Sequence, residues 1–346
     1  IKYLIYMNID RIAKKIIKST KKLPKTLFVY YHLINELILI NLETENILLK
    51  KNKNPKQGIF NLLVNLDKKI QIIKNTNKFS NLRKIKFELF KKEKSHKKIF
   101  NKLWVNYTKK QYIEERIQRY IKRIKINKII PKIKNKTIVD FGCGHGNFLI
   151  AASLLGAKKC IGIDYGKDSI LYANQITKKL GLTKKVKFYT RDIYNSKLTK
   201  NSFDFAIQNG VFHHLKNPDK GYQEIYRVLK PGGFLWTYTD GGGGVRDLIG
   251  DLSQEILKNL DINFKLSVIN NAQLNYNKQY HISDNINVKY THYLKNNYIK
   301  YLKKFGFKNF HQVIGGMPTD FDLTLKNDKF FKEKFGSGDL RFIAQK

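Results

Sequence analysis

The stretch Val139-Asp140-Phe141-Gly142-Cys143-Gly144-His145-Gly146 decides how this chain of 346 residues is interpreted. Its glycines stand at every second position, directly after the short apolar run Thr137–Phe141 and directly before Asn147–Leu155, which has helical character. Glycine permits a tight turn and a close backbone approach. A helix that begins here offers unpaired N–H groups and the positive end of its dipole to an anionic or electron-rich group. The stretch predicts a strand, a glycine turn and a helix that hold a ligand, and these residues alone leave open a turn with only a structural role.

The alternation of strand and helix continues beyond the turn. We expect further strands over Cys160–Ile163, Val186–Tyr189, Phe203–Ile207, Phe234–Tyr238, Phe310–Ile314 and Asp339–Ala344, and helices over Ser169–Leu180, Tyr222–Leu229 and Asn297–Phe305. This order indicates an α/β fold in which helices cover both faces of a mostly parallel, doubly wound sheet.

Acidic residues follow the second and third expected strands. Asp164 stands 18 residues beyond Gly146, where a carboxylate can accept hydrogen bonds from both hydroxyls of a ribose. The alternative for Asp164 is the N-cap of the next helix. Asp192 would be a loop residue if it stood alone, but in register with the other two features it is a candidate for the edge of an adenine ring.

Taken together, residues 137–240 resemble a class I methyltransferase dependent on S-adenosylmethionine. The landmarks of that family that match, in order, are the glycine turn, Asp164, Asp192, the stretch from Phe203-Asp204-Phe205-Ala206 through Val211-Phe212-His213-His214-Leu215, and Val228-Leu229-Lys230-Pro231-Gly232-Gly233. The resemblance implies a Rossmann-like fold and methyl transfer, and it covers about 100 residues. A nicotinamide-binding G-x-G-x-x-G is the weaker alternative, because Gly146 arrives one residue too early for it.

The resemblance also implies which residues contact the cofactor, S-adenosylmethionine. They are Asp140, Gly142, Cys143, Gly144, Gly146, Asp164, Tyr165, Asp192, Ile193, Asn209 and Gly210, together with Tyr107, which resembles an aromatic residue that many of these enzymes place over the cofactor. The landmarks do not specify the acceptor.

Methyl transfer from a sulfonium needs position and desolvation, and a hydroxyl or carbon acceptor usually needs a general base as well. The candidate catalytic residues follow the fourth and fifth strands: His213, His214 and Asp240. The alternative for the histidines is that they cap or pack a helix start. Neither Cys143 nor Cys160 is placed to be the nucleophile of cytosine-C5 methylation, and no metal site is expected.

The N-terminal part of the chain differs in charge from the rest. Residues 1–136 hold 36 Lys+Arg against 9 Asp+Glu, a net charge of +27 out of the +40 of the chain. We expect a basic, mixed α/β region over 1–97, with strands at Leu27–Tyr31 and Leu37–Leu42 and a helix at Ile59–Ile73. A helical lead-in over 98–135 follows, with a helix from Lys98 to Ile126 and a stop at Pro131. The methyltransferase domain spans 136–346 and includes a substrate-covering insertion at 241–295.

The positive charge can reflect either codon bias or selection for phosphate binding. It comes from 58 Lys and only 9 Arg. Selection for phosphate binding would favour Arg, whose side chain binds two oxygens at once, so codon bias explains this composition better. We therefore expect a small-molecule acceptor, with O-, N- or C-methylation undecided. The alternatives are an RNA methyltransferase that docks its substrate on the basic N-terminal region, and a nonenzymatic module that retains the cofactor fold. Two cysteines and the lack of a long apolar segment predict a cytoplasmic protein without a membrane span.

Overall fold

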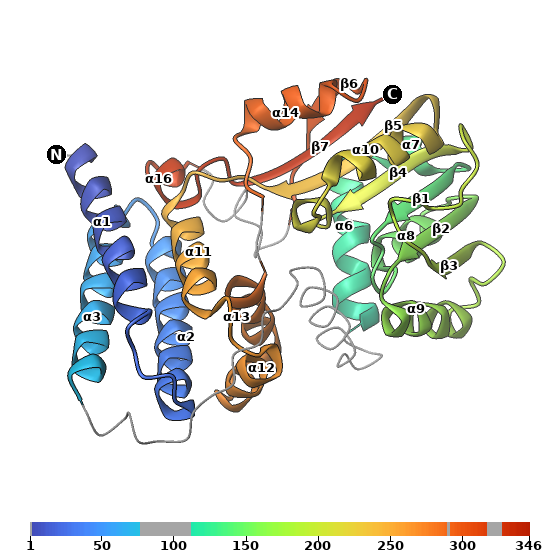
Figure 1. The fold of residues 1–346 in the computed structure, drawn as a ribbon. Coiled ribbons are helices and arrows are strands. Elements are labelled where there is room, and N and C mark those ends of the chain that lie inside the picture. The colour runs from blue at the N-terminus through green and yellow to red at the C-terminus, as the bar shows by residue number, and fades with distance from the viewer. Residues whose placement is uncertain (1, 77–111, 289–290, 317–326) are drawn as a thin grey trace. The chain divides into compact units, whose positions relative to one another are not determined.

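The structure is a computed structural model that describes residues 2–76, 112–288, 291–316 and 327–346 (Figure 1). The described residues form two compact units. The first contains residues 2–76, 242–288 and 327–336, and the second contains residues 112–241, 291–316 and 337–346. The chain therefore leaves the second unit after residue 241 and returns to it twice.

The second unit is built on a seven-stranded sheet with the order β3-β2-β1-β4-β5-β7-β6. Strands β1 to β5 are parallel, and β7 runs antiparallel to both β5 and β6. The bounds are β1 Thr137–Phe141, β2 Lys159–Asp164, β3 Val186–Thr190, β4 Phe203–Asn209, β5 Leu229–Asp240, β6 Lys308–Gln312 and β7 Asp339–Gln345. These strands confirm the expected mostly parallel sheet. The strand order reverses between β1 and β4, which is where open parallel sheets bind ligands.

Helices cover both faces of this sheet (Figure 1). One face packs against α6 Gln118–Ile126, which follows the π-helix Tyr112–Ile117, and against α8 Asn147–Leu154 and α9 Lys167–Lys179. The other face packs against α10 Pro218–Val228 and α14 Lys295–Lys303. Successive strand residues serve opposite faces, since Ile138 belongs to the first core and Val139 to the second.

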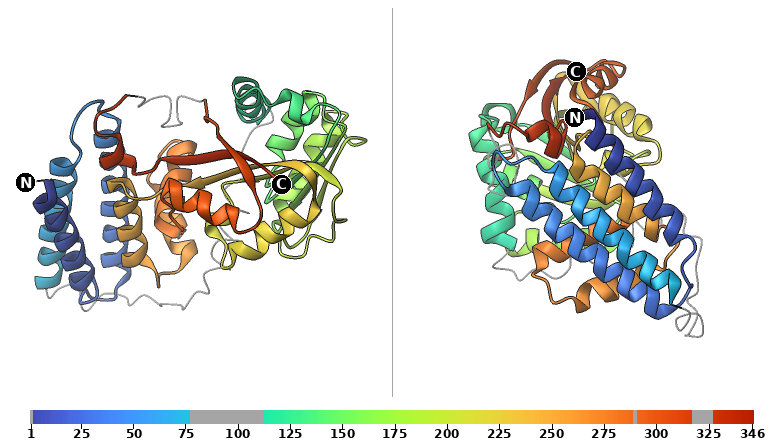
Figure 2. Two further views of the ribbon diagram at one scale, coloured as in Figure 1. Left: turned by 90° about the horizontal axis from the view of Figure 1, so that it is seen from above. Right: turned by 90° about the vertical axis from the view of Figure 1, so that its left-hand side faces the viewer.

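The first unit is helical throughout its described residues. Its helices are α1 Lys2–Thr20, α2 Leu27–Leu49, α3 Lys56–Asn75, α11 Val245–Leu257, α12 Ile262–Asn271, α13 Tyr276–Asn287 and α16 Phe331–Phe335. Figure 2 shows α1, α2 and α3 side by side, and α2 also packs against α11 and α12. None of the described helices is long and apolar enough to cross a membrane.

The expectation of strands at Leu27–Tyr31 and Leu37–Leu42 was wrong, because both segments lie within helix α2. Thr26 caps the start of this helix by accepting a hydrogen bond from the backbone N of Val29. The β-branched and aromatic residues fit strands locally, but they recur along α2 at helical spacing and are buried by several neighbouring helices. Tertiary packing of this kind overrides a weak local preference.

Helix α3 confirms the helix expected at Ile59–Ile73. Of the helix expected from Lys98 to Ile126, residues 98–111 lie outside the described residues, and 112–126 are helical. Pro131 does not end that run. The helix already ends at Ile126, and Pro131 stands in the first turn of the short helix α7 Ile130–Ile133, where its missing N–H carries no penalty.

A buried ion pair holds the first unit together. Lys334 donates to the carboxylate of Asp328 at 2.8 Å, and both side chains are fully buried. The same ammonium donates to the carbonyl of Lys50 at 2.6 Å, and the backbone N of Asn52 donates to Asp328 at 3.0 Å. Segment 327–336 is thereby attached to the loop that follows α2.

We predict that Lys334→Met destabilises the protein by about 3–5 kcal/mol, because it leaves the carboxylate of Asp328 buried without its cation. The matched change Lys332→Met, at an exposed position of the same helix, should alter the free energy of unfolding by less than about 0.5 kcal/mol. Denaturant unfolding of both variants measures the difference. Equal stabilities would show that the pair contributes nothing.

Candidate cofactor site and active site

The glycine turn joins β1 to α8 at the carboxyl edge of the sheet. Its first two N–H groups, those of Gly142 and Cys143, donate to the carbonyl of Ile163 at 2.8 and 3.1 Å. A Cβ at Gly146 would lie 2.1 Å from the ring of Phe188, so a side chain there is excluded by packing. A Cβ at Gly144 would meet nothing within 4 Å. Gly144 therefore presents bare backbone to open space, which is what a closely approaching ligand requires.

Two of the predicted acids lie at this turn. Asp164, at the end of β2, accepts a hydrogen bond from the backbone N of Gly144 and another from that of Gly166, each at 2.8 Å. Burial raises the pKa of Asp164, although these two bonds oppose the shift. The carboxylate is thus held in one orientation beside the turn. The alternative role of Asp164 as N-cap of α9 is not seen, since the N-cap residue of that helix is Gly166.

Asp140 is the second of these acids and is 3% exposed. Burial raises its pKa well above the usual range, and the nearby Asp164 raises it further. Its Oδ1 atom has no hydrogen-bond partner among the described residues, and the same holds for Oδ1 of Asn147 at the start of α8. A buried polar atom without a partner costs about 1–3 kcal/mol, so this turn is suited to a ligand that supplies donors.

Tyr112, which the sequence analysis did not identify as a site residue, also stabilises the glycine turn. Tyr112 is fully buried and donates its hydroxyl hydrogen bond to the carbonyl of His145. The imidazole of His145 packs against Tyr172 at a centroid distance of 4.6 Å. Burial, together with the charge of Arg116, lowers the pKa of His145 to about 3. The only sequence signal for Tyr112 was its place in an apolar helical pattern.

Two further predicted cofactor residues, Asp192 and Ile193, follow the third strand. Asp192 is exposed and accepts a hydrogen bond from the backbone N of Tyr194 at 2.8 Å, while Ile193 is buried. The backbone N of Arg191 donates to the carbonyl of Asp164 at 2.9 Å, which keeps the ends of β3 and β2 together. Tyr165 is 53% exposed at the same edge. Tyr107 lies outside the described residues, so its role stays a prediction.

The loop after β4 lies against the glycine turn, since a Cβ at Gly142 would come within 2.6 Å of Val211. Asn209 is occupied by structural bonds: it accepts from Trp236 at 3.1 Å and donates to the hydroxyl of Tyr120 at 3.2 Å. Gly210 has a φ of +76° and is bordered by the ring of Tyr238. The expected contacts of Asn209 and Gly210 with a cofactor stay predictions.

Gln208 organises this loop, a role that no local sequence pattern indicates. Its Oε1 accepts from the backbone N of Val211 and Phe212 at 3.1 and 3.3 Å, and its Nε2 lies 3.0 Å from the hydroxyl of Tyr222. The side chain is fully buried. It therefore holds the loop in the shape that directs His213 and His214 toward the end of β5.

The two histidines are coupled to each other. Nδ1 of His213 lies 3.2 Å from the backbone N of Asp240, which can only donate, and 3.0 Å from the hydroxyl of Thr239, which can donate as well, so both contacts are satisfied when this Nδ1 accepts. A neutral His213 then carries its proton on Nε2, which lies 2.9 Å from Nε2 of His214. His214 therefore accepts at Nε2 and, when neutral, carries its proton on Nδ1. The basic nitrogen of His214 is engaged by this hydrogen bond and that of His213 by the bond from Asp240, so either imidazole would have to lose a hydrogen bond before it could act as a base.

Asp240 belongs to a polar cluster that sequence reasoning did not foresee. The hydroxyl of Tyr238 donates to Asp240 at 3.0 Å and lies 3.4 Å from Asp339, the cross-strand partner of Asp240. Arg341 pairs with Asp339 at 3.0 Å and stacks on the ring of Tyr238 at 4.3 Å. Asp339 and Arg341 come from β7, far along the chain from β5, so only the folded sheet brings these groups together.

A family profile described as a methyltransferase domain matches residues 132–306, just over half of the chain. The chain belongs to this family. Its cofactor is S-adenosylmethionine, and the residues present fit that group: the open backbone at Gly144 permits close approach, and the unpartnered oxygen of Asp140 suits the ammonium of the methionine part.

Three relatives carry different acceptors in their names. Sterol 24-C-methyltransferase of Pneumocystis carinii is 32% identical over 105 residues, which cover 30% of this chain and 28% of that protein. Mitochondrial ubiquinone biosynthesis O-methyltransferase of Dictyostelium discoideum is 28% identical over 137 residues, with 37% and 43% covered. Ribosomal protein L11 methyltransferase of Haemophilus influenzae is 34% identical over 103 residues, with 30% and 33% covered. The chain spans less than half the length of each relative.

We predict that Gly144→Ala lowers the affinity for S-adenosylmethionine at least about tenfold, or 1.4 kcal/mol, because the added methyl group occupies the open space beside the turn. Gly181→Ala is the matched control. Both glycines have positive φ values, +50° and +69°, and open space around them, so both variants bear a similar backbone cost of about 1–2 kcal/mol. Calorimetric titration should show the loss of affinity for Gly144→Ala alone. An equal loss in both variants would assign the effect to backbone strain.

Proposed function

We propose that this chain transfers the methyl group of S-adenosylmethionine to a small-molecule acceptor at the carboxyl ends of β4 and β5. The observation that carries the proposal is the polar cluster around Tyr238, which borders Gly210 in the loop that touches the glycine turn. Arg341 is 3% exposed, and the side chain of Asp339 is 6% exposed. Convergent polar groups that are this well buried suit the recognition of a compact ligand better than that of an extended one.

Under this proposal the cofactor supplies a methyl group that its sulfonium already activates. The turn around Gly144 accepts the cofactor's close approach, Asp140 pairs with its ammonium, and Asp164 accepts from its ribose hydroxyls. Asp240 is the favoured group to take a proton from the acceptor, and Tyr238 orients it by donating at 3.0 Å. The histidine pair supports Asp240 from its backbone side rather than acting as the base itself.

The remaining expectations about the chain are part of the same proposal. Segment 241–295 follows β5 directly in sequence, which supports a part for it in acceptor binding. The role of residues 1–97 is unknown; we propose that they help to build the acceptor pocket, and under the RNA alternative they dock the substrate. Cys143 and Cys160 are both free and buried, which supports a reducing, cytoplasmic compartment.

The acceptor class can be tested without knowing the acceptor. The protein is incubated with S-adenosylmethionine labelled in its methyl group and a cell extract, which is then separated into small molecules, RNA and protein. We expect label in the small-molecule fraction, and less of it at limiting cofactor concentration when Gly144→Ala replaces the wild type. Label in RNA would contradict the proposal and favour an RNA methyltransferase. The net charge of +27 in residues 1–136 supports that alternative.

A further inference from the structure

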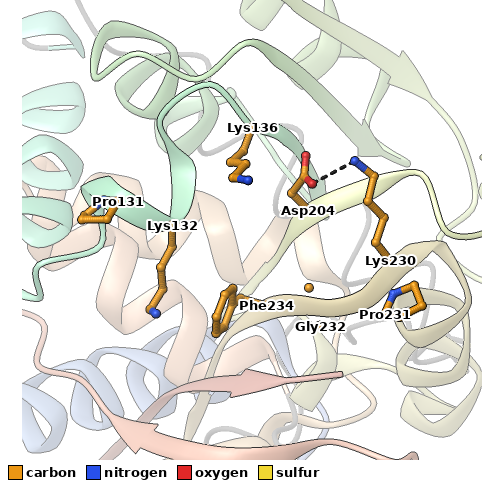
Figure 3. Close-up of a pocket in the computed structure, with 9 residues that line it drawn as sticks. Pro131, Lys132, Lys136, Asp204, Lys230, Pro231, Gly232 and Phe234 are labelled. Atoms are coloured by element: carbon orange, nitrogen blue, oxygen red, sulfur yellow. Dashed lines mark hydrogen bonds and ion pairs between the residues drawn. The ribbon is translucent and has the colours of Figure 1, made fainter.

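A depression lies at the amino ends of β1 and β4, at the opposite edge of the sheet from the glycine turn (Figure 3). Its volume is about 430 Å³. Helix α7 borders it on one side and the turn after Leu229 on the other. All of its lining residues belong to the second unit, and none of them has a part in the proposed methyl transfer.

The lining carries three ammonium groups and one carboxylate: those of Lys132, Lys136, Lys230 and Asp204. Lys230 donates to Asp204 at 2.8 Å, and Thr137 donates to it from its backbone N at 2.8 Å and its hydroxyl at 2.7 Å. Partial burial works against ionisation, but these bonds lower the pKa of Asp204 to about 2. Asp204 is therefore charged and balances one lysine only.

The charges of Lys132 and Lys136 are not balanced in this way. The ammonium of Lys132 lies 4.1 Å from the ring centroid of Phe234, a cation–π contact that leaves its charge uncancelled. Within the described part of the chain, no ion pair or side-chain hydrogen bond involves the ammonium of Lys136. Figure 3 shows Lys136 next to Asp204 and Lys132 next to Phe234, with their ammonium groups apart from each other.

Glycine is required at two positions of the turn that borders this depression. A Cβ at Gly233 would lie 2.9 Å from the carbonyl oxygen of Lys230 and 3.2 Å from that of Asp204, so no side chain fits there. Gly232 has a φ of +76°, which other residues rarely adopt. The shape of this border is therefore set by the backbone of the turn.

We propose that this depression binds a phosphate group through the ammonium groups of Lys132 and Lys136, which both line it. Two cations that line one concave site attract a dianion more strongly than isolated surface lysines do, because the walls focus the field. The phosphate can belong to a small phosphorylated molecule or to the backbone of RNA, and the two sources are separated by the test. The proposal does not depend on the identity of the methyl acceptor.

The test compares two double variants of equal charge. Lys132→Gln with Lys136→Gln removes the proposed site, and Lys178→Gln with Lys179→Gln removes two exposed lysines from the end of α9. The probes are pyrophosphate and a ten-nucleotide single-stranded RNA, each titrated by calorimetry over a range of salt concentrations. Binding of S-adenosylmethionine, whose site is at the other edge of the sheet, checks that both variants remain folded.

We expect the first variant to lose about tenfold or more in pyrophosphate affinity, and the second to stay within about twofold of the wild type. If the natural source is RNA, the first variant also lowers RNA affinity more than the second and reduces the slope of log K against log salt by about 1.4. If it is a small molecule, the two variants bind RNA alike. The proposal would be overturned if the wild type did not bind pyrophosphate, or if both variants lost the same affinity for it. The second result would show that the lysines act only through the overall positive charge of the protein.

Discussion

The hydrogen bond from the backbone N of Gly144 to the carboxylate of Asp164 is the constraint on which the site depends. It joins the turn after β1 to the end of β2, and a side chain with another shape at position 164 could not satisfy both Gly144 and Gly166. Because Gly144 has no side chain and borders open space, the same peptide can approach a ligand closely. Packing excludes a side chain at Gly146, so the turn has little freedom to take any other path.

Other parts of the second unit act on this turn from separate directions. Tyr112 holds it through the carbonyl of His145, and Val211 touches it at Gly142. Gln208 in turn shapes the loop that contains Val211, through bonds to the backbone at 3.1 and 3.3 Å. The glycine turn and the loop after β4, where we propose that the acceptor binds, are therefore linked by packed and hydrogen-bonded groups. A change in one is expected to be felt in the other.

The sequence was informative where function depends on short, local patterns. The glycine turn, Asp164 and the alternation of strands and helices could be read directly, because each signal lies within a few residues. The helix α2 was misread as strands because its β-branched residues were weighed over short windows, whereas its burial pattern repeats over 23 residues. Gln208, Tyr112 and Arg341 were missed for another reason. Their structural roles depend on hydrogen-bond and stacking partners that are not their neighbours in sequence, so no local pattern predicts these roles.

The central claim is that Asp164 at the carboxyl edge of the sheet binds S-adenosylmethionine. Calorimetric titration of Asp164→Ala against Asp168→Ala tests it most directly, because Asp168 is an exposed acid in the first turn of the neighbouring helix α9. The account predicts a loss of about 1.5–3 kcal/mol in binding free energy for Asp164→Ala, the value of hydrogen bonds to a charged group. It predicts no loss for Asp168→Ala. An affinity of Asp164→Ala equal to that of the wild type would contradict the account.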